Sequence, residues 1–381
     1  MGKKSIDWEK EIVSDSIGQK GLVSVVIPTY NRNKIIKDTL ESVRDQTYRP
    51  IELIVVDDGS TDGTESFIRE WEESIKPGSS LFFHYFYQEN QGQAAARNFG
   101  ILRSRGEYIQ YLDSDDLLHP NKIEKQMHVA CSYPGFILCG PWRHVRELKE
   151  VNILKEASDL LDLNQDIIDQ WLHGYYFAPH ALLWPRSVVM SIGPWDESLV
   201  RELDGDYFLK AVLNGFRFKY VQGAWSFYRQ LPSEYRQESH TASLDAAESR
   251  EKVVRRLMIA LREKGLFEKY RKSLSAWFYY AAKVYAGAQP EFAEKCFKQS
   301  RKLYKNPDIP QNRFSYWIQR LSSKNPKNDY FDLKSKYIFE DRWHKFVDAY
   351  QRKSFGKAFL FLLLSLSNHP KRTLKRILKK R

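Results

Sequence analysis

Two acidic clusters each follow a short apolar run of the chain. One begins at Asp57, directly after the run 51–56, and the other begins at Asp113, directly after the run 108–112. Because open α/β sheets bind their ligands at the carboxyl ends of parallel strands, we expect both clusters at one edge of a sheet. Carboxylate oxygens are the ligands that hard divalent cations prefer, and a cation held there can neutralise a diphosphate. The spacing therefore predicts a site for a divalent cation and a nucleotide-activated substrate.

The elements that would position these clusters alternate between two patterns. Short β-branched or aromatic runs are typical of buried strands, and apolar residues at helical spacing are typical of helices. The predicted strands are 22–27, 51–56, 81–87 and 108–112, and the predicted helices between them are 34–46, 61–71 and 93–103. This order predicts an α/β fold with a mainly parallel central sheet and helices on both faces.

Composition limits the class of protein. The 42% hydrophobic and 14% aromatic content is enough for a packed core, which excludes wholesale disorder. Cys131, Cys139 and Cys296 show no CxxC spacing, so we expect no zinc site and a reducing compartment. The first residues lack the apolar core of a signal peptide, and the longest apolar run, 358–366, is much shorter than the ~20 residues of a transmembrane helix. We therefore expect a cytoplasmic protein.

The pattern changes along the chain. Strand signals fade between 145 and 172, and from about residue 246 long amphipathic helical segments follow one another with few strand signals. We predict four regions: an N-terminal extension at 1–20, a catalytic domain at 21–245, a helical region at 246–335 and an amphipathic basic tail at 336–381.

Four motifs occur in a fixed order in the first half of the chain. They are VSVVIPTYNR at 23–32, VVDDGSTDGT at 55–64, NQGQAAARNFG at 90–100 and YLDSDD at 111–116. In this order and spacing they resemble the family-two inverting glycosyltransferases, over roughly residues 21 to 230. The resemblance implies a GT-A fold, which is Rossmann-like, with the helical region as a C-terminal appendage. It also implies a nucleotide-sugar donor, of which a UDP-sugar is the first expectation, and Mn²⁺ or Mg²⁺ as cofactor.

The resemblance assigns several residues to the donor. Tyr30 would stack its ring on the base, and Asp58 would accept the N–H of uracil. Outside this set of motifs Tyr30 would simply cover core, and Asp58 would form an Asx-turn or a helix cap. Arg97 would either face the diphosphate or hold the nearby acidic loop, and both options stay open. The other predicted donor-binding residues are Pro28, Thr29, Arg32, Asp113 and Ser114.

Asp113 and Asp115 form a DxD pair. Residues two apart at a strand end point to the same side, so both carboxylates can serve one site. By the resemblance Asp115 is the metal ligand, while Asp113 contacts the ribose or a metal-bound water. A surface acidic turn is the alternative, with Asp116 as a helix cap. His240 falls where many relatives keep a histidine near the metal, and we predict it as a second ligand, although a lone loop histidine is otherwise merely solvated.

An inverting transfer also needs a base. A carboxylate must accept the proton of the acceptor hydroxyl while that oxygen attacks the anomeric carbon. Counting forward from the family-like segment 192–199 gives Asp204 as this base. The chain departs from the family pattern here, because Leu203 stands where a glutamate normally precedes the aspartate. Glu202 and Asp206 are the alternative bases, and capping of the following helix is the non-catalytic alternative for Asp204.

The end of the chain carries a separate signal. Apolar residues in 359–366 are followed by seven Lys and Arg residues in 371–381, with no acid among them. Such a segment suits an anionic bilayer surface, at ~1 kcal/mol per basic residue, and a solvated tail is the alternative. The net charge of +12 does not by itself indicate nucleic acid, since no nucleic-acid-binding fold accompanies it.

These patterns lead to two hypotheses of function. The first is a transferase on the inner face of the cell membrane that moves a sugar to a glycan or lipid-linked acceptor, with His180 as a further residue of the acceptor pocket. The second is a non-catalytic nucleotide-sugar binder or scaffold of a polysaccharide assembly system. It is suggested by the irregular sequence at Leu203, and turnover that vanishes in Asp204→Asn would separate the two.

Overall fold

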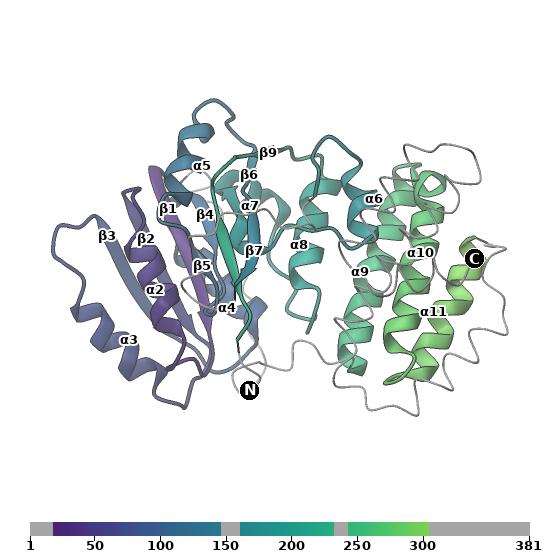
Figure 1. Ribbon diagram of the computed structural model, residues 1–381, viewed down its shortest axis with the longest axis horizontal. Coiled ribbons are helices and arrows are strands. Elements are labelled where there is room, and N and C mark those ends of the chain that lie inside the picture. Colours follow the sequence, from purple (N-terminus) through teal and green to yellow (C-terminus); the bar gives the residue numbers. More distant parts are fainter. Residues whose placement is uncertain (1–17, 146–160, 232–242, 305–381) are drawn as a thin grey trace, which may run out of the picture. The chain divides into compact units, whose positions relative to one another are not determined.

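The computed structural model describes residues 18–145, 161–231 and 243–304 (Figure 1). Most of the predicted N-terminal extension, His240 and the basic tail lie outside these residues. The chain divides into two compact units, Met1–Ser239 with Glu248–Tyr270 and His240–Ala247 with Arg271–Arg381. The boundaries predicted at 245 and 335 remain predictions.

A seven-stranded sheet forms the centre of the first unit, in the order β3-β2-β1-β4-β8-β6-β9. The first four strands of that order are parallel to one another, and β8 is antiparallel to both β4 and β6. The predicted mainly parallel sheet is therefore confirmed. The strands are β1 Gln19–Thr29, β2 Ile51–Asp57, β3 Leu81–Tyr87, β4 Gly106–Tyr111, β6 Ile137–Cys139, β8 Leu182–Pro185 and β9 Phe218–Tyr220.

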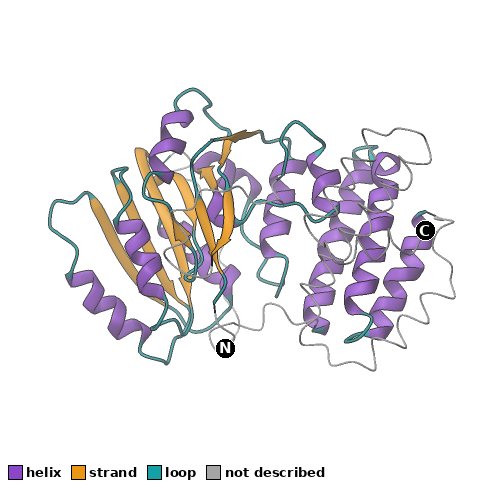
Figure 2. Ribbon diagram, in the orientation of Figure 1, coloured by secondary structure: helices purple, strands orange, loops and turns teal. Residues whose placement is uncertain are grey.

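Helices cover both faces of this sheet (Figure 2). Alternate residues of a strand point to opposite faces, and β1 shows the consequence. Val25 lies in the same core cluster as Leu40 of α2, whereas Val26 lies on the other face, against Gly100 of α4. The helices around the sheet are α2 Ile36–Arg44, α3 Thr64–Glu73, α4 Gln93–Arg103, α5 Lys122–Ala130, α6 Ile167–Leu172, α7 Arg186–Ile192 and α8 Leu203–Leu213, with a 3₁₀ turn at Pro179–Ala181.

A second, three-stranded sheet has the order β5-β10-β7. Its strands are β5 Leu117–Leu118, β7 Trp142–Val145 and β10 Ser226–Arg229. β10 is antiparallel to β5 and parallel to β7. Because β5 follows the DxD sequence directly, this small sheet fixes the far end of the acidic loop.

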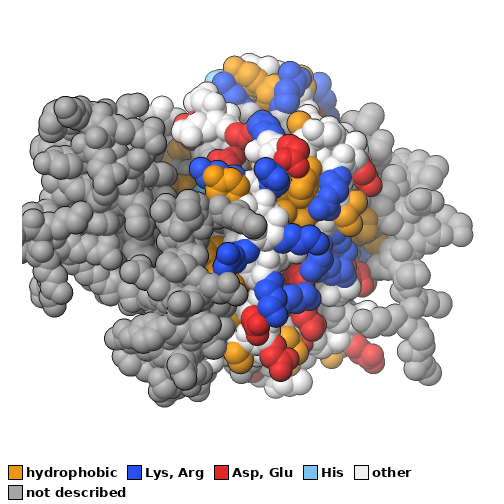
Figure 3. Space-filling model, turned by 90° about the vertical axis from the view of Figure 1, so that its right-hand side faces the viewer, with side chains coloured by type: hydrophobic (Ala, Val, Ile, Leu, Met, Phe, Trp, Pro, Cys, Tyr) orange, Lys and Arg blue, Asp and Glu red, His pale blue; other side chains and the backbone are white. Residues whose placement is uncertain are grey.

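Three long helices end the described chain, as the sequence predicted: α9 Leu244–Glu263, α10 Phe267–Tyr285 and α11 Pro290–Leu303. In the second unit α10 and α11 pack together, and Ser275 Oγ donates a hydrogen bond to the carbonyl of Ser300. Lys and Arg side chains gather on the side of the molecule shown in Figure 3, and α11 exposes Lys295, Lys298 and Lys302. Among the described residues, no helix combines the length and apolar character needed to cross a membrane.

Candidate active site

Helix α4 connects three of the predicted site residues. Its N-cap Gly92 donates its backbone N–H to Asp58 Oδ2 at 2.8 Å. Gln93, in the first turn, donates to Asp113 Oδ1 at 2.9 Å. Arg97, one turn further on, donates to both Asp113 and Asp204. The first two turns of one helix thus bring together carboxylates from three distant parts of the sequence.

Arg97 is fully buried and forms the centre of this site. Its Nη2 lies 2.6 Å from Asp113 Oδ1, and its Nη1 lies 2.8 Å from Asp204 Oδ1. Burial alone would lower the pKa of the guanidinium, but the two carboxylates outweigh burial and raise the pKa above its ordinary value. Arg97 thus contacts Asp113 of the acidic loop and holds Asp204 in the same way, and its contact with a diphosphate stays a prediction.

Aromatic side chains pack beside Arg97. The Trp195 ring lies 4.3 Å from the guanidinium carbon, in cation–π geometry. Tyr207 stacks on Trp195 with a centroid distance of 4.0 Å, and its hydroxyl lies 3.2 Å from that of Tyr111. These aromatic residues were not predicted from the sequence. The spacing of Asp204 and Tyr207 could have indicated the position of Tyr207, because residues three apart lie on one face of a helix.

The three candidate bases differ in their surroundings. The side chain of Asp204 is 45% exposed, against 28% for Glu202 and 7% for Asp206. Glu202 Oε1 accepts a hydrogen bond from Arg250 Nε at 2.6 Å, and Asp206 forms ion pairs with Arg256 and Lys210. Although the Asp204 side chain is partly exposed, the surrounding protein desolvates its carboxyl group and raises its pKa above the ordinary value, against the opposing charge of Arg97. Asp204 is therefore the most accessible of the three and the one beside the acidic loop.

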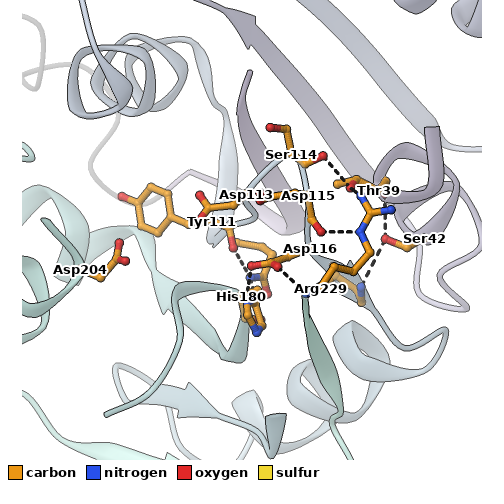
Figure 4. Close-up of polar contacts among 12 residues, drawn as sticks. Thr39, Ser42, Tyr111, Asp113, Ser114, Asp115, Asp116, His180, Asp204 and Arg229 are labelled. Atoms are coloured by element: carbon orange, nitrogen blue, oxygen red, sulfur yellow. Dashed lines mark hydrogen bonds and ion pairs between the residues drawn. The ribbon is translucent and has the colours of Figure 1, made fainter. Parts of the chain in front are cut away.

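The DxD pair lies in the loop between β4 and β5 (Figure 4). Asp115 Oδ2 lies 3.5 Å from Arg32 Nη2. Burial raises the pKa of Asp115 to about 7, and the neighbouring Asp116 and Asp113 add to this effect against the opposing charges of Arg32 and Arg229.

Asp115 fits the divalent cation that the resemblance implies, as one of only a few protein ligands. No group of three or more His, Cys, Asp or Glu side chains in the described part of the chain can enclose a cation. Mg²⁺ in phosphoryl sites is commonly held by one or two carboxylates together with substrate phosphates and water. The half-buried carboxylate of Asp115, with a side chain 31% exposed, matches that arrangement. His240, the second predicted ligand, is not among the described residues.

Asp116 and His180 anchor the acidic loop from below (Figure 4). His180 Nδ1 lies 2.8 Å from Asp116 Oδ2, and the backbone N–H of Arg229 donates to Asp116 Oδ1 at 3.0 Å. Helix α5 has Asn121 as its N-cap, so Asp116 does not cap it. His180 is fully buried, so it lies behind the loop and not on an open acceptor surface.

Arg229 fixes the same loop to α2. Its Nε donates to the carbonyl of Asp115, and its Nη1 lies 2.8 Å from Asp38 Oδ2. Its Nη2 donates to the carbonyl of Ile35 at 2.8 Å and to Thr39 Oγ1 at 3.1 Å. Arg229 is a further residue that the sequence did not reveal as part of the site.

The motifs that are predicted to bind the donor lie at the carboxyl ends of β1 and β2. Asp58 is buried and accepts hydrogen bonds from Gln88 Nε2, at 2.7 Å, and from the backbone N–H groups of Gln91 and Gly92. A carboxylate offers about four acceptor positions, so these three donors, among the described residues, leave about one position for a ligand. Tyr30 is exposed at the end of β1, as stacking on a base would require.

The remaining predicted donor residues lie around the same edge. Pro28 and Thr29 are buried at the end of β1 and pair with Val56 and Asp57. The backbone N–H of Arg32 donates to Thr64 Oγ1 at 2.9 Å. The carbonyl of Ser114 accepts a hydrogen bond from Thr39 Oγ1 at 3.0 Å. These contacts are structural, and donor contacts of these four residues remain predictions.

Comparison with known proteins relates part of this chain to a family. Residues 24–188 match the sequence model of glycosyl transferase family 2. An uncharacterized glycosyltransferase of Rickettsia typhi is 33% identical over 197 residues, which are 50% of this chain and 58% of that protein. TuaG of Bacillus subtilis, named as a candidate teichuronic acid biosynthesis glycosyltransferase, is 40% identical over 126 residues, which are 31% of this chain and 48% of that protein. The chain thus spans about half the length of these two relatives.

A solved structure is similar in fold. The crystal structure of Staphylococcus aureus TarS matches with a TM-score of 0.51 and 17% sequence identity, over 79% of this chain and 55% of that one. At this identity the likeness concerns the fold alone. It agrees with the predicted GT-A architecture of a mainly parallel sheet with flanking helices.

Proposed function

We propose, from the premise that residues 24–188 belong to glycosyl transferase family 2, that this protein transfers a sugar from a nucleotide-diphosphate donor to an acceptor hydroxyl. The observation that carries the proposal is the double ion pair of Arg97. It holds the DxD residue Asp113 and the candidate base Asp204 on one guanidinium, in a single site.

Asp204 acts as the base in this proposal. Its carboxylate takes the proton of the acceptor hydroxyl, and the oxygen forms a bond to the anomeric carbon. The bond from that carbon to the diphosphate oxygen breaks on the opposite face, so the configuration inverts. A carboxylate whose pKa is raised is a stronger base once ionised, which favours Asp204 for this role. Arg97 keeps the carboxylate in place before the acceptor arrives.

Asp115 would hold the divalent cation, Mg²⁺ or Mn²⁺. When bound, the cation supplies positive charge against the departing diphosphate. Arg32 lies beside Asp115 and adds a second positive charge at the same place. Asp113, which is tied to Arg97 and Gln93, serves to shape the loop and to contact the ribose.

Asp58 and Tyr30 select the base of the donor. The free acceptor position on Asp58 suits the N–H of a pyrimidine, and the exposed ring of Tyr30 suits stacking on its face. We therefore propose a UDP-sugar as the donor. The name of TuaG, which refers to teichuronic acid biosynthesis, supports a glycan as the acceptor class. Peripheral contact with an anionic membrane on its cytoplasmic side is proposed from the basic sequence 371–381.

A donor screen tests the proposal. The purified chain is incubated with UDP-, GDP- and dTDP-sugars, with Mn²⁺ or with chelator, and nucleotide released by transfer of the sugar to water or to an added glycan acceptor is measured. We expect release from one class of donor, dependent on the cation. A chain that binds nucleotide-sugars and releases nothing under any condition would instead be the non-catalytic binder.

A further inference from the structure

One face of helix α9 contacts the loop that leads into α8. Ser249, Lys252 and Arg256 lie three and four residues apart, so their side chains project from one side of the helix. Ser249 Oγ accepts the backbone N–H of Val200 at 3.1 Å. Lys252 Nζ lies 3.5 Å from Asp196 Oδ2. All these residues belong to the first compact unit.

Arg256 joins this loop to the first turn of α8. Its Nη2 donates to Asp196 Oδ2, and its Nη1 lies 3.1 Å from Asp206 Oδ1. Asp206 is buried, whereas the Arg256 side chain is 42% exposed, so salt screens this ion pair only partly. Asp206 comes two residues after Asp204. The first turn of α8 is therefore held by Arg97 through Asp204 and by Arg256 through Asp206.

Glu202, directly before α8, is held by the same helix. Its φ of 59° is in the left-handed region, which a residue other than glycine occupies only where its surroundings enforce it. The ion pair with Arg250, at 2.6 Å, turns its carboxylate toward α9. Leu203, which replaces the family's glutamate, is buried. Glu202, one residue before the position of the family's glutamate, thus helps to fix the backbone at the start of α8.

We propose that α9 positions the base: Arg256 is a positioning residue that acts on Asp204 through Asp206 and Asp196, and Arg250 does so through Glu202. The inference rests on the proposed function, since it needs Asp204 to act as a base. It assigns a role in the reaction to a helix that follows the region matched by the family, 24–188. The sequence departs from the family pattern at Leu203. Near this residue, Glu202 and Asp206 form ion pairs with Arg250 and Arg256 of α9.

Arg255 provides a matched control. It is the neighbour of Arg256 and the same residue type, but it forms an ion pair with Glu251 on its own helix, one turn away. Replacing Arg255 by methionine removes the same charge and volume from α9 without touching the loop or α8. Arg256→Lys keeps the charge but cannot reach two carboxylates with one planar group.

The experiment measures two quantities on Arg256→Met, Arg256→Lys and Arg255→Met. The first is turnover of the accepted donor, separated into kcat and KM. We expect kcat to fall about 10- to 100-fold in Arg256→Met, with the donor KM little changed, because a displaced base affects the chemical step. Arg256→Lys should recover part of the loss, and Arg255→Met should match the parent. The second is amide hydrogen exchange of residues 196–206, which should accelerate in Arg256→Met, less in Arg256→Lys, and not in Arg255→Met.

The outcomes separate the two proposals. Equal kcat in Arg256→Met and Arg255→Met overturns the inference, as does unchanged exchange in 196–206. A rise in KM with unchanged kcat also overturns it, because that result assigns α9 to substrate binding. A parent that turns over no donor refutes the proposed function, and the exchange measurement alone then decides whether α9 holds the start of α8.

Discussion

Replacement of Arg97 by methionine removes the cation that two carboxylates share. Methionine fills a similar space and lies against Trp195 without strain, so the change concerns charge more than volume. Asp113 and Asp204 are left facing one another across the site without their common donor. Both the stability of the first unit and the pKa of Asp204 should change.

The magnitude follows from the burial of the three groups. Removing one partner of a fully buried pair costs about 3–5 kcal/mol, because the remaining charge is uncompensated. Arg97 is fully buried, but Asp113 and Asp204 are 22% and 45% exposed, so water screens part of the remaining charge. We therefore expect a loss of about 2–3 kcal/mol. For a unit of this size that corresponds to a Tm lower by roughly 5–10 °C.

Thermal unfolding followed by circular dichroism measures this loss. Arg103→Met is the control: Arg103 lies on the same helix, and its described ring contacts are with Phe86 and Phe99, not with the site. We expect the control to melt within about 2 °C of the parent, since exposed substitutions rarely exceed ±0.5 kcal/mol. Equal Tm values for Arg97→Met and Arg103→Met would falsify the proposed structural role of Arg97.

Three further predictions concern single groups. Because burial raises the pKa of Asp204 and the base works when ionised, kcat/KM should fall on acidification with an apparent pKa above 3.8, and a midpoint at or below 3.8 contradicts this assignment. Burial lowers the pKa of Lys122 well below 10.5, so the unfolded chain binds more protons than the folded chain, and the free energy of unfolding should rise as the pH increases toward 10.5. Urea titrations of Lys122→Met should show a flatter dependence of this free energy on pH. A slope equal to that of the parent would contradict the prediction. A methyl group on Gly100 would lie 2.5 Å from Val26 Cγ1. Gly100→Ala should therefore lower the free energy of unfolding by about 1–3 kcal/mol in the same titration. An unchanged free energy would show that β1 and α4 can move apart.

The central elements could be predicted because their patterns are local. The predicted strand 81–87 and helix 93–103 have the bounds of β3 and α4. Helix α3 begins at Thr64, three residues after the predicted start at 61, because Gly63 adopts a left-handed φ of 88°. The strands beyond β4 were missed, since elements such as β7 and β10 have four residues each and are too short to show a period.

The site was predictable in its residue types but not in its pairings. The motifs indicated acidic residues at strand ends, and the structure brings Asp113 and Asp204 onto Arg97. Nothing local in the sequence couples Arg97 to a carboxylate 107 residues away, because such a pairing depends on how α8 packs beside the sheet. The same holds for Asp116 with His180, and for Arg256 with Asp206.

The Asp204→Asn variant tests the role of the base most directly. The substitution keeps the shape of the side chain and a hydrogen-bonding oxygen for Arg97, so the fold and the donor site should be retained. With the accepted donor and a divalent cation present, we expect nucleotide release to fall about 10²–10⁴-fold while the dissociation constant of the nucleotide stays within about twofold of the parent. Release within about tenfold of the parent would show that another group accepts the proton.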